Sequence, residues 1–549
     1  MTFDAASPDD SPTDRESRPW VPGLRIVSLT TFASRILGLV RDIAMAALFG
    51  NGVVMDAFSI AFKIPNIARR LFGEGAVTAA FLPAFVHERE HIGEPAAYRL
   101  ATAVLGSLLL WLSALVAVCE AILLSAITLF DWSWETQLLL GLTAVLLPYL
   151  VLICLTAQGS AVLHASGQFF VPAVAPIVLN AVWIAAVWTL APAFSDQVSQ
   201  IYIISVSLVI AGFLQLGLVA AALSRSGFRF MGPDSDSRRK VRRIVTAMAP
   251  VVLGLSITQL NTLSDSVIAW AYSAPDQSVE VTNVPHNNPG FELPSGTAAS
   301  LYFGQRMYQF PLGVFGVALG TVLFPTLAQH AGRQDTEPFQ RALILALRLV
   351  AFIGVPASAG LVVLAEPLSV LLFQRGAFDE ADAAQTAQMI AAYGVGVWAY
   401  CALLILLRAY YALGDRMTPV RVGLLAVGLN LSLNFGLMFS IGAVGLACST
   451  AVTAMCEAGL NGWLLQSRIG RVKWQELRST VGRCVIATSL MIAVCLASLH
   501  FVTLVDLPFE RLMRVLIPLA ASIVTYLLAS HWLGMDELQL LLGSRSRRN

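Results

Sequence analysis

The sequence contains little charge for its length. Only 13% of its 549 residues are charged, whereas 57% are hydrophobic, and the mean hydropathy is +0.72. Soluble globular chains carry about 25% charged and about 45–50% apolar residues. No soluble core can hide this much apolar surface, so lipid must surround most of the chain. The composition excludes a soluble enzyme, and we expect no nucleic-acid partner.

Motifs for disulfides, nucleotides and secretion are also missing. The seven cysteines are scattered through apolar stretches without C-x-x-C spacing, which indicates free buried thiols. No G-x-x-x-x-G-K-[ST] loop is present, so we expect neither a cofactor nor a nucleotide-driven cycle. Residues 1–22 are rich in Asp, Ser and Pro and do not have the pattern of a signal peptide. We expect them to form a disordered cytoplasmic tail.

Long apolar runs predict an all-α polytopic membrane protein, because about 20 apolar residues cross the hydrocarbon. We predict about 14 transmembrane helices. The predicted spans lie near residues 24–49, 56–86, 97–128, 137–163, 170–192, 199–223, 241–272, 298–328, 340–371, 384–412, 418–440, 442–466, 479–503 and 510–533.

Alternate loops are basic, which predicts the orientation of the chain. Lys and Arg crowd residues 225–243, 408–421 and 468–478 and the C-terminal end, whereas the segment 273–297 holds three acidic residues and no Lys or Arg. We therefore expect both termini to be cytoplasmic, in a bacterial cytoplasmic (inner) membrane.

The two halves of the chain repeat. Ala165-Ser166-Gly167-Gln168 before Pro172 matches Ala412-Leu413-Gly414-Asp415 before Pro419, and Pro65 matches Pro311 at nearly the same offset. Six spans per copy predict two lobes of like orientation, related by a pseudo-twofold axis along the membrane normal. We expect a disordered tail (1–22), an N-lobe (23–224), a basic cytoplasmic linker (225–240), a C-lobe (241–467), two further helices (468–535) and a basic cytoplasmic tail (536–549).

Several charges fall inside predicted spans. An ionisable group at the bilayer centre costs at least about 2.5–3.5 kcal/mol and is a functional-site candidate by default. From a rise of 1.5 Å per residue, Arg35, Arg69 and Arg306 each lie roughly 12–20 Å inside their spans. The arginine fork binds phosphate oxygens bidentately. We predict that these three arginines meet near mid-membrane and bind an anionic phosphate or diphosphate.

The alternative is that the charges pair within the protein. The spacing allows pairs between Arg35 and Asp42, between Lys63 and Asp56, and between Arg70 and Glu74. Separately, the second span contains breaks in its helical pattern, which favour a gating helix over a static one. Its candidate structural or gating residues are Asp42, Arg70, Glu74, Pro65, Gly73 and Gly75.

A second polar cluster lies in the predicted C-lobe. Asp265, Asn430, Asn434 and Thr450 all fall inside apolar spans, and the two asparagines share a helix face. Their oxygens could bind a monovalent cation such as Na⁺, which would couple transport to an ion gradient. Hydrogen bonding between helices is the alternative.

The charged spans resemble the MurJ (MviN) family of the MOP flippase superfamily. The resemblance covers nearly the whole chain beyond the N-terminal tail and is strongest at residues 31–42, 56–58, 62–66, 69–72, 74–76, 311–314 and 372–378. It implies a flippase, not an enzyme, that moves lipid II, the undecaprenyl-diphosphate-linked peptidoglycan precursor, from the cytoplasmic to the periplasmic leaflet by alternating access. Its implied partners are lipid II, membrane lipids and the cell-wall synthesis machinery. The implied substrate residues are Arg35, Arg41, Asp56, Arg69 and Arg306, to which the intramembrane charge pattern adds Lys63.

Gln305 and Gln309 depart from the family pattern, which often has acidic residues at these positions. Other functions stay open at this point. Within the same fold, the chain could export drugs or another polyprenyl-linked glycan, although a cation exporter would line its cavity with carboxylates rather than arginines. A membrane glycosyltransferase would need a sizeable extramembrane loop with catalytic groups, and the loops here are short.

Overall fold

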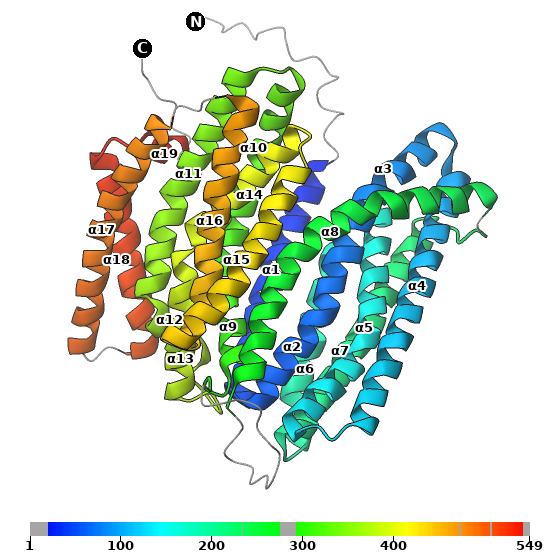
Figure 1. Ribbon diagram of the computed structural model, residues 1–549, viewed down its shortest axis with the longest axis horizontal. Helices are drawn as coiled ribbons and strands as arrows, with labels where there is room; N and C mark the ends of the chain where they lie inside the picture. The colour runs from blue at the N-terminus through cyan, green and yellow to red at the C-terminus, as the bar shows by residue number, and fades with distance from the viewer. Residues whose placement is uncertain (1–19, 233, 275–291, 471–473, 506–507, 542–549) are drawn as a thin grey trace, which may run out of the picture. The chain divides into compact units, whose positions relative to one another are not determined.

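The computed structural model describes residues 20–232, 234–274, 292–470, 474–505 and 508–541. These residues are helical almost throughout, and their one β contact is an isolated bridge between Ser273 and Leu293. The predicted all-α class is confirmed (Figure 1). Nearly all of the predicted N-terminal tail, most of the segment 273–297 and the last eight residues lie outside the described residues.

Helices follow one another through the chain with short connections. The first half contains α1 (Trp20–Phe49), α2 (Val53–Ala68), the π-helix η2 (Arg69–Gly75), α3 (Ala76–His91), α4 (Glu94–Leu129), α5 (Trp134–Ala165), α6 (Phe170–Ala185), the π-helix η3 (Ala186–Leu190), the 3-10 turn η4 (Ala191–Ala193) and α7 (Gln197–Arg225).

The second half begins with the long helix α8. It contains α8 (Ser235–Tyr272), α9 (Thr297–Pro311), the π-helix η5 (Leu312–Gly316), α10 (Val317–Gly332), α11 (Thr336–Val363), α12 (Ala365–Phe373), α13 (Glu380–Val395), α14 (Val397–Ala412), α15 (Met417–Ile441), α16 (Val444–Ile469), α17 (Gln475–Leu504), α18 (Glu510–Trp532) and α19 (Asp536–Leu541).

Each predicted span coincides with one helix or with consecutive helices. Among the described helices, eight are long and apolar enough to cross a membrane, and α13 and α14, bent by 43°, make a ninth if they form one span. The remaining predicted spans are α1, α2–η2–α3, α8, α9–η5–α10 and α16. These spans hold the predicted site residues Arg35, Arg69, Asp265, Arg306 and Thr450, and two of them are interrupted by π-helices. In those two spans the π-helices leave α-helices of only 15 or 16 residues, which are shorter than the about 20 residues that cross the hydrocarbon.

The chain divides into two compact units. Unit 1 consists of residues 1–44 and 61–255, and unit 2 of residues 45–60 and 256–549. The predicted lobe boundaries stay a prediction, as does the pseudo-twofold relation between the lobes.

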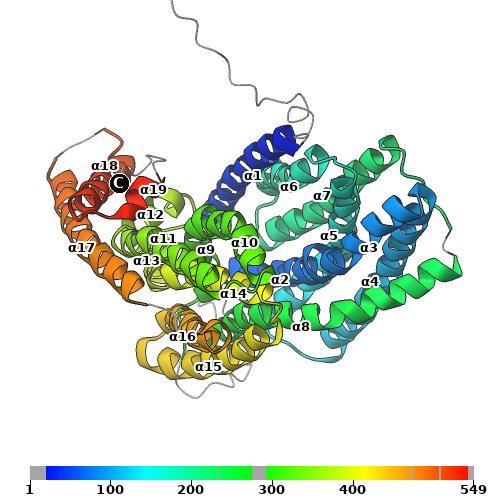
Figure 2. The ribbon, with the colours of Figure 1, turned by 90° about the horizontal axis from the view of Figure 1, so that it is seen from above.

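In unit 1, α5 is the central helix. It packs against α4, α7, α3 and η2, and α6 packs against α7 (Figures 1 and 2). Gln215 of α7 connects three of these helices: its Oε1 accepts a hydrogen bond from the hydroxyl of Tyr149 in α5 at 3.4 Å, and its Nε2 donates to the carbonyl of Ala175 in α6 at 2.7 Å. A buried amide with both ends bonded fixes the packing of its neighbours.

Unit 2 repeats this pattern. Its helix α14 packs against α11, α16, α10 and η5, and α15 packs against α16 (Figure 1). Tyr410 of α14 donates a hydrogen bond to the carbonyl of Asn461 in α16 at 2.9 Å. Asn461 lies 246 residues after Gln215, which is the offset of the sequence repeat. In each copy of the repeat, a residue of the sixth helix therefore forms a hydrogen bond with a tyrosine of the fourth helix. The added helices α17 and α18 pack against each other, and α17 also packs against α11.

The repeated Ala-x-Gly motif ends the fourth helix in each unit. Gly167 and Gly414 both have φ of +75°, a left-handed conformation that favours glycine. Gln168 N–H donates to Leu163 O at 2.9 Å, and Asp415 N–H donates to Tyr410 O at 3.0 Å. These are equivalent Schellman bonds, which satisfy carbonyls at the helix end. The internal repeat predicted from the sequence is therefore present in the backbone of each unit.

Candidate substrate and ion sites

Arg41 is enclosed within unit 1, where it is 7% exposed. Its Nε and Nη2 donate to Oδ1 of Asp42 at 3.0 and 2.6 Å, and its Nη1 donates to Oδ1 of Asn180 in α6 at 3.0 Å. Its guanidinium carbon lies 4.3 Å from the centre of the Trp183 ring. A buried charge is tolerated when it is paired and hydrogen-bonded. These contacts favour a structural role for Arg41, while its substrate role stays a prediction.

The sequence spacing suggested that Asp42 would pair with Arg35. The structure gives Asp42 the adjacent Arg41 as a partner, and Arg35 lies exposed on α1. Arg69 is half-buried and begins η2. Arg35 and Arg69 belong to unit 1 and Arg306 belongs to unit 2, so the meeting of the three guanidinium groups stays a prediction.

The second span is broken where the sequence predicted a bend. Pro65 is buried inside α2, and the backbone then changes to the π-helix η2 until Gly75. Gly73 lets η2 approach α5, because a Cβ there would lie 2.9 Å from the Cβ of Ala157. Proline and π-bulges are the usual causes of a sharp helix kink. The break is confirmed, and its gating role stays a prediction.

Three more predicted residues lie along this span. Lys63 is half-buried and Arg70 is exposed. The side chain of Glu74 lies outside the described residues, so its suggested pairing with Arg70 stays a prediction.

Asp56 binds the first turn of α9. It is 1% exposed; its Oδ2 accepts a hydrogen bond from Gly296 N–H at 3.0 Å and its Oδ1 from Ala299 N–H at 2.5 Å. The first amides of a helix have no partner within the helix and favour a negative charge. Asn51 supports the same contact by donating to the hydroxyl of Ser300 at 2.9 Å. Asp56 therefore fixes α9, the helix that carries Arg306, and its direct role in substrate binding stays a prediction.

Arg306 is half-buried within unit 2, on α9. Its Nη2 donates to the hydroxyl of Tyr302 at 2.8 Å and its Nη1 to Oε1 of Gln309 at 3.5 Å, and its guanidinium carbon lies 4.6 Å from the centre of the Tyr302 ring. Gln305 is directed elsewhere and donates to the hydroxyl of Tyr393 at 3.2 Å. Tyr302 and Gln309 orient the guanidinium but are neutral, so neither contact cancels its charge.

The predicted polar cluster comes together within unit 2. Asp265, Asn430 and Asn434 are fully buried. Asp265 accepts hydrogen bonds from Asn434 Nδ2 and Thr450 Oγ1, each at 2.7 Å, and Asn434 Nδ2 also donates to Asn430 Oδ1 at 3.1 Å. Ser449, which the sequence analysis did not include, donates to Asn434 Oδ1. The cluster supplies carboxylate, amide and hydroxyl oxygens, the donor types that hard cations prefer. Binding of a cation stays a prediction.

Two short motifs typical of metal-dependent enzymes have other partners here. In His87-Glu88-Arg89-Glu90-His91 the buried Glu88 pairs with Lys240 at 2.8 Å. In Asp234-Ser235-Asp236 the first carboxylate caps α8, and hydrogen bonds from Ser237 lower the pKa of Asp234. Across the parts of the chain that the structure describes, no three His, Cys, Asp or Glu side chains gather into a metal site.

Several partners of the predicted residues were not predicted from the sequence. Asn180 and Trp183 bind Arg41, and a polar residue inside the apolar helix α6 was the available signal for Asn180. Arg348 of α11 was also missed: its Nε donates to Oε1 of Glu537 at 2.7 Å and to the hydroxyl of Thr480 at 3.1 Å. These bonds hold α17 and α19 against α11 at the predicted cytoplasmic end of unit 2.

Comparison with known proteins identifies the family. The family described as "Lipid II flippase MurJ" matches residues 45–515. A protein of Vibrio cholerae named "Probable lipid II flippase MurJ" is 32% identical over 448 residues, which cover 79% of this chain and 81% of that protein. The chain belongs to the lipid II flippase MurJ family. A MurJ relative from Haemophilus influenzae, named in the same words, is 31% identical over 78% of this chain and 83% of its own length.

Solved structures agree on the fold. A structure titled "Lipid II flippase MurJ, inward closed conformation" matches 93% of this chain and 99% of its own, with a TM-score of 0.72 and 22% identity. A multidrug resistance MATE family transporter of the MOP superfamily, in an inward-facing conformation, has a TM-score of 0.63 at 12% identity and covers 80% of this chain and 95% of its own. The resemblance to the MurJ family and the polytopic membrane fold are thus confirmed.

Proposed function

We propose that this protein is a flippase that moves lipid II from the cytoplasmic to the periplasmic leaflet of the bacterial inner membrane. Its membership of the MurJ family, which extends over residues 45–515, is the observation that carries the proposal. The basic loops support an orientation with both termini in the cytoplasm. Enzymes of cell-wall synthesis, which make and consume the lipid, would be its functional partners.

The diphosphate of the substrate would bind Arg35, Arg69 and Arg306. Arg306 offers the strongest local support, because hydrogen bonds to Tyr302 and Gln309 orient its planar guanidinium. A diphosphate can accept bidentate, charge-assisted hydrogen bonds from such a group. The polyprenyl chain would stay in lipid while the polar head crosses, and release would follow when the cavity opens to the other side.

Alternating access needs segments that change shape. The π-helices η2 and η5 interrupt the second helix of each copy of the repeat. π-bulges occur frequently at functional sites, and such a break can absorb a change in helix direction. We therefore assign the hinge of unit 1 to η2, with Pro65, Gly73 and Gly75 as its hinge residues, and the hinge of unit 2 to η5.

A monovalent cation, Na⁺ in our proposal, would bind the cluster of Asp265, Asn430, Asn434 and Thr450. Both carboxylate oxygens of Asp265 now accept hydrogen bonds from neighbouring side chains. A cation would replace those bonds, and rotation of the Asn434 amide would turn its oxygen toward Asp265. Ion binding would thereby change the contacts among α8, α15 and α16.

The function is tested by labelling lipid II at the outer leaflet in cells depleted of this protein. We expect labelled lipid II to fall while total lipid II accumulates, and restoration by the wild-type chain. Unchanged outer-leaflet labelling would contradict the assignment. For the ion, we expect Asp265→Ala or removal of sodium to slow transport; transport indifferent to both would leave the cluster a structural role only.

A further inference from the structure

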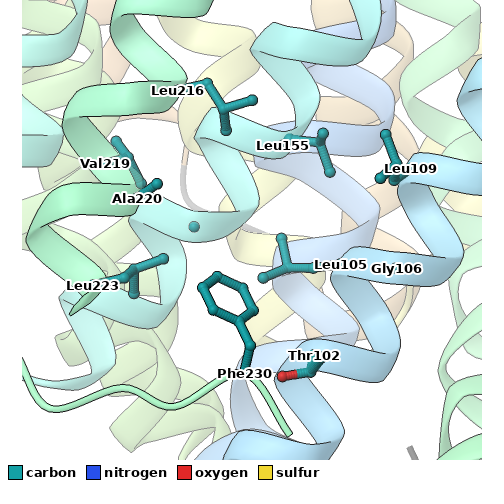
Figure 3. A pocket seen from close by; sticks show the side chains of 11 residues that line it. Thr102, Leu105, Gly106, Leu109, Leu155, Leu216, Val219, Ala220, Leu223 and Phe230 are labelled. Atoms are coloured by element: carbon teal, nitrogen blue, oxygen red, sulfur yellow. The ribbon is translucent and has the colours of Figure 1, made fainter. Parts of the chain in front are cut away.

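An apolar cavity lies between α4, α5 and α7, within unit 1 (Figure 3). Its volume is about 260 Å³, just below the range of about 300–1,000 Å³ that is usual for pockets that enclose a drug-sized ligand. Of the residues that line it, Thr102 alone has a polar side chain, and its hydroxyl accepts a hydrogen bond from Met231 N–H at 3.3 Å. A polar ligand would find no partner there, so the occupant must be apolar where it enters the cavity.

The loop after α7 borders one end of this cavity through Phe230. Phe228 is buried against Tyr98, with ring centres 4.8 Å apart, and Phe230 packs edge-on against Phe228 at 5.1 Å. Figure 3 shows the Phe230 ring directed into the space between α4 and α7. Leu109, on the far side of the lining, is 44% exposed, so the cavity reaches the apolar surface of α4. In a membrane that surface faces hydrocarbon chains.

Two arginines lie near the end of the cavity that the loop borders. Arg225 is the last residue of α7 and Arg229 directly precedes Phe230, and both side chains are exposed. Basic groups beside apolar pockets between membrane helices are suited to anionic lipid head groups. An apolar cavity with two arginines near one end fits a ligand that has an apolar chain and an anionic head group.

We propose that this cavity holds an acyl chain of an anionic glycerophospholipid, whose phosphate head lies on Arg225 and Arg229. The bound lipid would stabilise the packing of the loop at 226–232 against the ends of α4 and α7. The site is formed within unit 1 by residues other than those assigned to transport, so it is separate from the proposed diphosphate site.

The test is photo-crosslinking of the purified full-length protein in phosphatidylcholine vesicles that contain phosphatidylglycerol with a diazirine at the end of one acyl chain. We expect labelled peptides from α4, α5 and α7. Gly106 lines the cavity, and a Cβ added there meets nothing within 4 Å, so Gly106→Phe should fill the cavity without a clash. Gly217→Phe is the matched control, because Gly217 is equally open but does not line the cavity.

We expect Gly106→Phe to reduce labelling of these peptides to the level of the lipid-exposed helix α18, and Gly217→Phe to leave it unchanged. Arg225→Gln and Arg229→Gln should each lower the preference for phosphatidylglycerol over phosphatidylcholine about fivefold, since one basic residue near a membrane surface contributes about 1 kcal/mol. Arg238→Gln, an equal loss of charge on α8, should leave this preference unchanged.

Two results would overturn the proposal. Labelling that Gly106→Phe leaves intact would mean that the probe samples only the general lipid surroundings. Competition by undecaprenyl phosphate but not by unlabelled phosphatidylglycerol would assign the cavity to a polyprenyl chain.

Discussion

Arg41 and Arg306 are both intramembrane arginines, but their surroundings differ. Arg41, in unit 1, is buried and donates two hydrogen bonds to the carboxylate of Asp42. Arg306, in unit 2, is half-buried and donates to a phenol and an amide. The first guanidinium has a permanent counter-charge within hydrogen-bond distance. The second donates hydrogen bonds to two neutral side chains, Tyr302 and Gln309.

This difference separates two uses of the same residue type. A buried arginine with a carboxylate partner contributes to packing, because the carboxylate offsets the free-energy cost of burying the positive charge. An arginine whose guanidinium is oriented by neutral hydrogen-bond partners can present its planar fork to an anionic ligand. We therefore expect changes around Arg41 to act on stability, and changes around Arg306 to act on transport.

The largest effect should come from Asp42→Asn. It leaves the Arg41 charge buried without its carboxylate, which typically costs about 3–5 kcal/mol. The measurement is the free energy of unfolding of the purified protein in detergent. The double change Arg41→Met with Asp42→Leu should recover most of the loss, because it removes both charges. Equal stability of Asp42→Asn and wild type would show that Arg41 does not depend on this partner.

Asn180→Ala should cost less, about 1.5–3 kcal/mol, the contribution of a hydrogen bond to a charged group. The same unfolding measurement checks it. Asn66→Ala is the matched control in unit 1, since the Asn66 amide donates only to the carbonyl of Phe62 in its own helix. A larger loss for Asn66→Ala than for Asn180→Ala would contradict the role given to the contact between Asn180 and Arg41.

Arg306→Lys should leave stability nearly unchanged and slow transport about tenfold, because lysine keeps the charge but loses the planar fork. Transport of fluorescent lipid II in reconstituted vesicles gives the rate. Arg341→Lys is the control, since Arg341 is exposed and pairs only with Glu337 on its own helix. Wild-type transport by Arg306→Lys would mean that bidentate binding is not used.

The smallest effect should come from Gln309→Glu, which gives Arg306 a carboxylate neighbour and so makes it resemble Arg41. A partly exposed ion pair is worth about 0.2–1 kcal/mol, so substrate affinity should fall by no more than about fivefold. Gln329→Glu, on the exposed surface of α10, controls for the added charge. Tighter substrate binding by Gln309→Glu would contradict the proposal that the positive charge of Arg306 attracts the anionic substrate.

The sequence was sufficient to predict the helices, because lipid leaves the backbone few alternatives to the helix. It was also sufficient for the break near Pro65 and for the cluster around Asp265, since proline and intramembrane polar residues are visible without any structure. The π-helices at 186–190 and 312–316 were not predicted. The first contains no proline or glycine, whereas the second follows Pro311 and contains Gly313 and Gly316, a signal that was available in the sequence.

Long-range partners could not be predicted. Asn180 lies 139 residues from Arg41, and Gly296 lies 240 residues from Asp56. Helical spacing suggests only neighbours on the same helix, such as Arg35 for Asp42. Which faces of α1 and α6 meet is decided by packing between helices, and this is why the contact between Arg41 and Asn180 became known only from the structure.

The most direct test of the central claim is transport by the double variant Arg35→Ala with Arg306→Ala. The variant would be reconstituted beside Arg341→Ala and assayed for movement of fluorescent lipid II between leaflets. We predict that the double variant folds and inserts normally but does not transport, whereas Arg341→Ala transports at the wild-type rate. Full transport by the double variant would contradict the role of these arginines in binding the diphosphate.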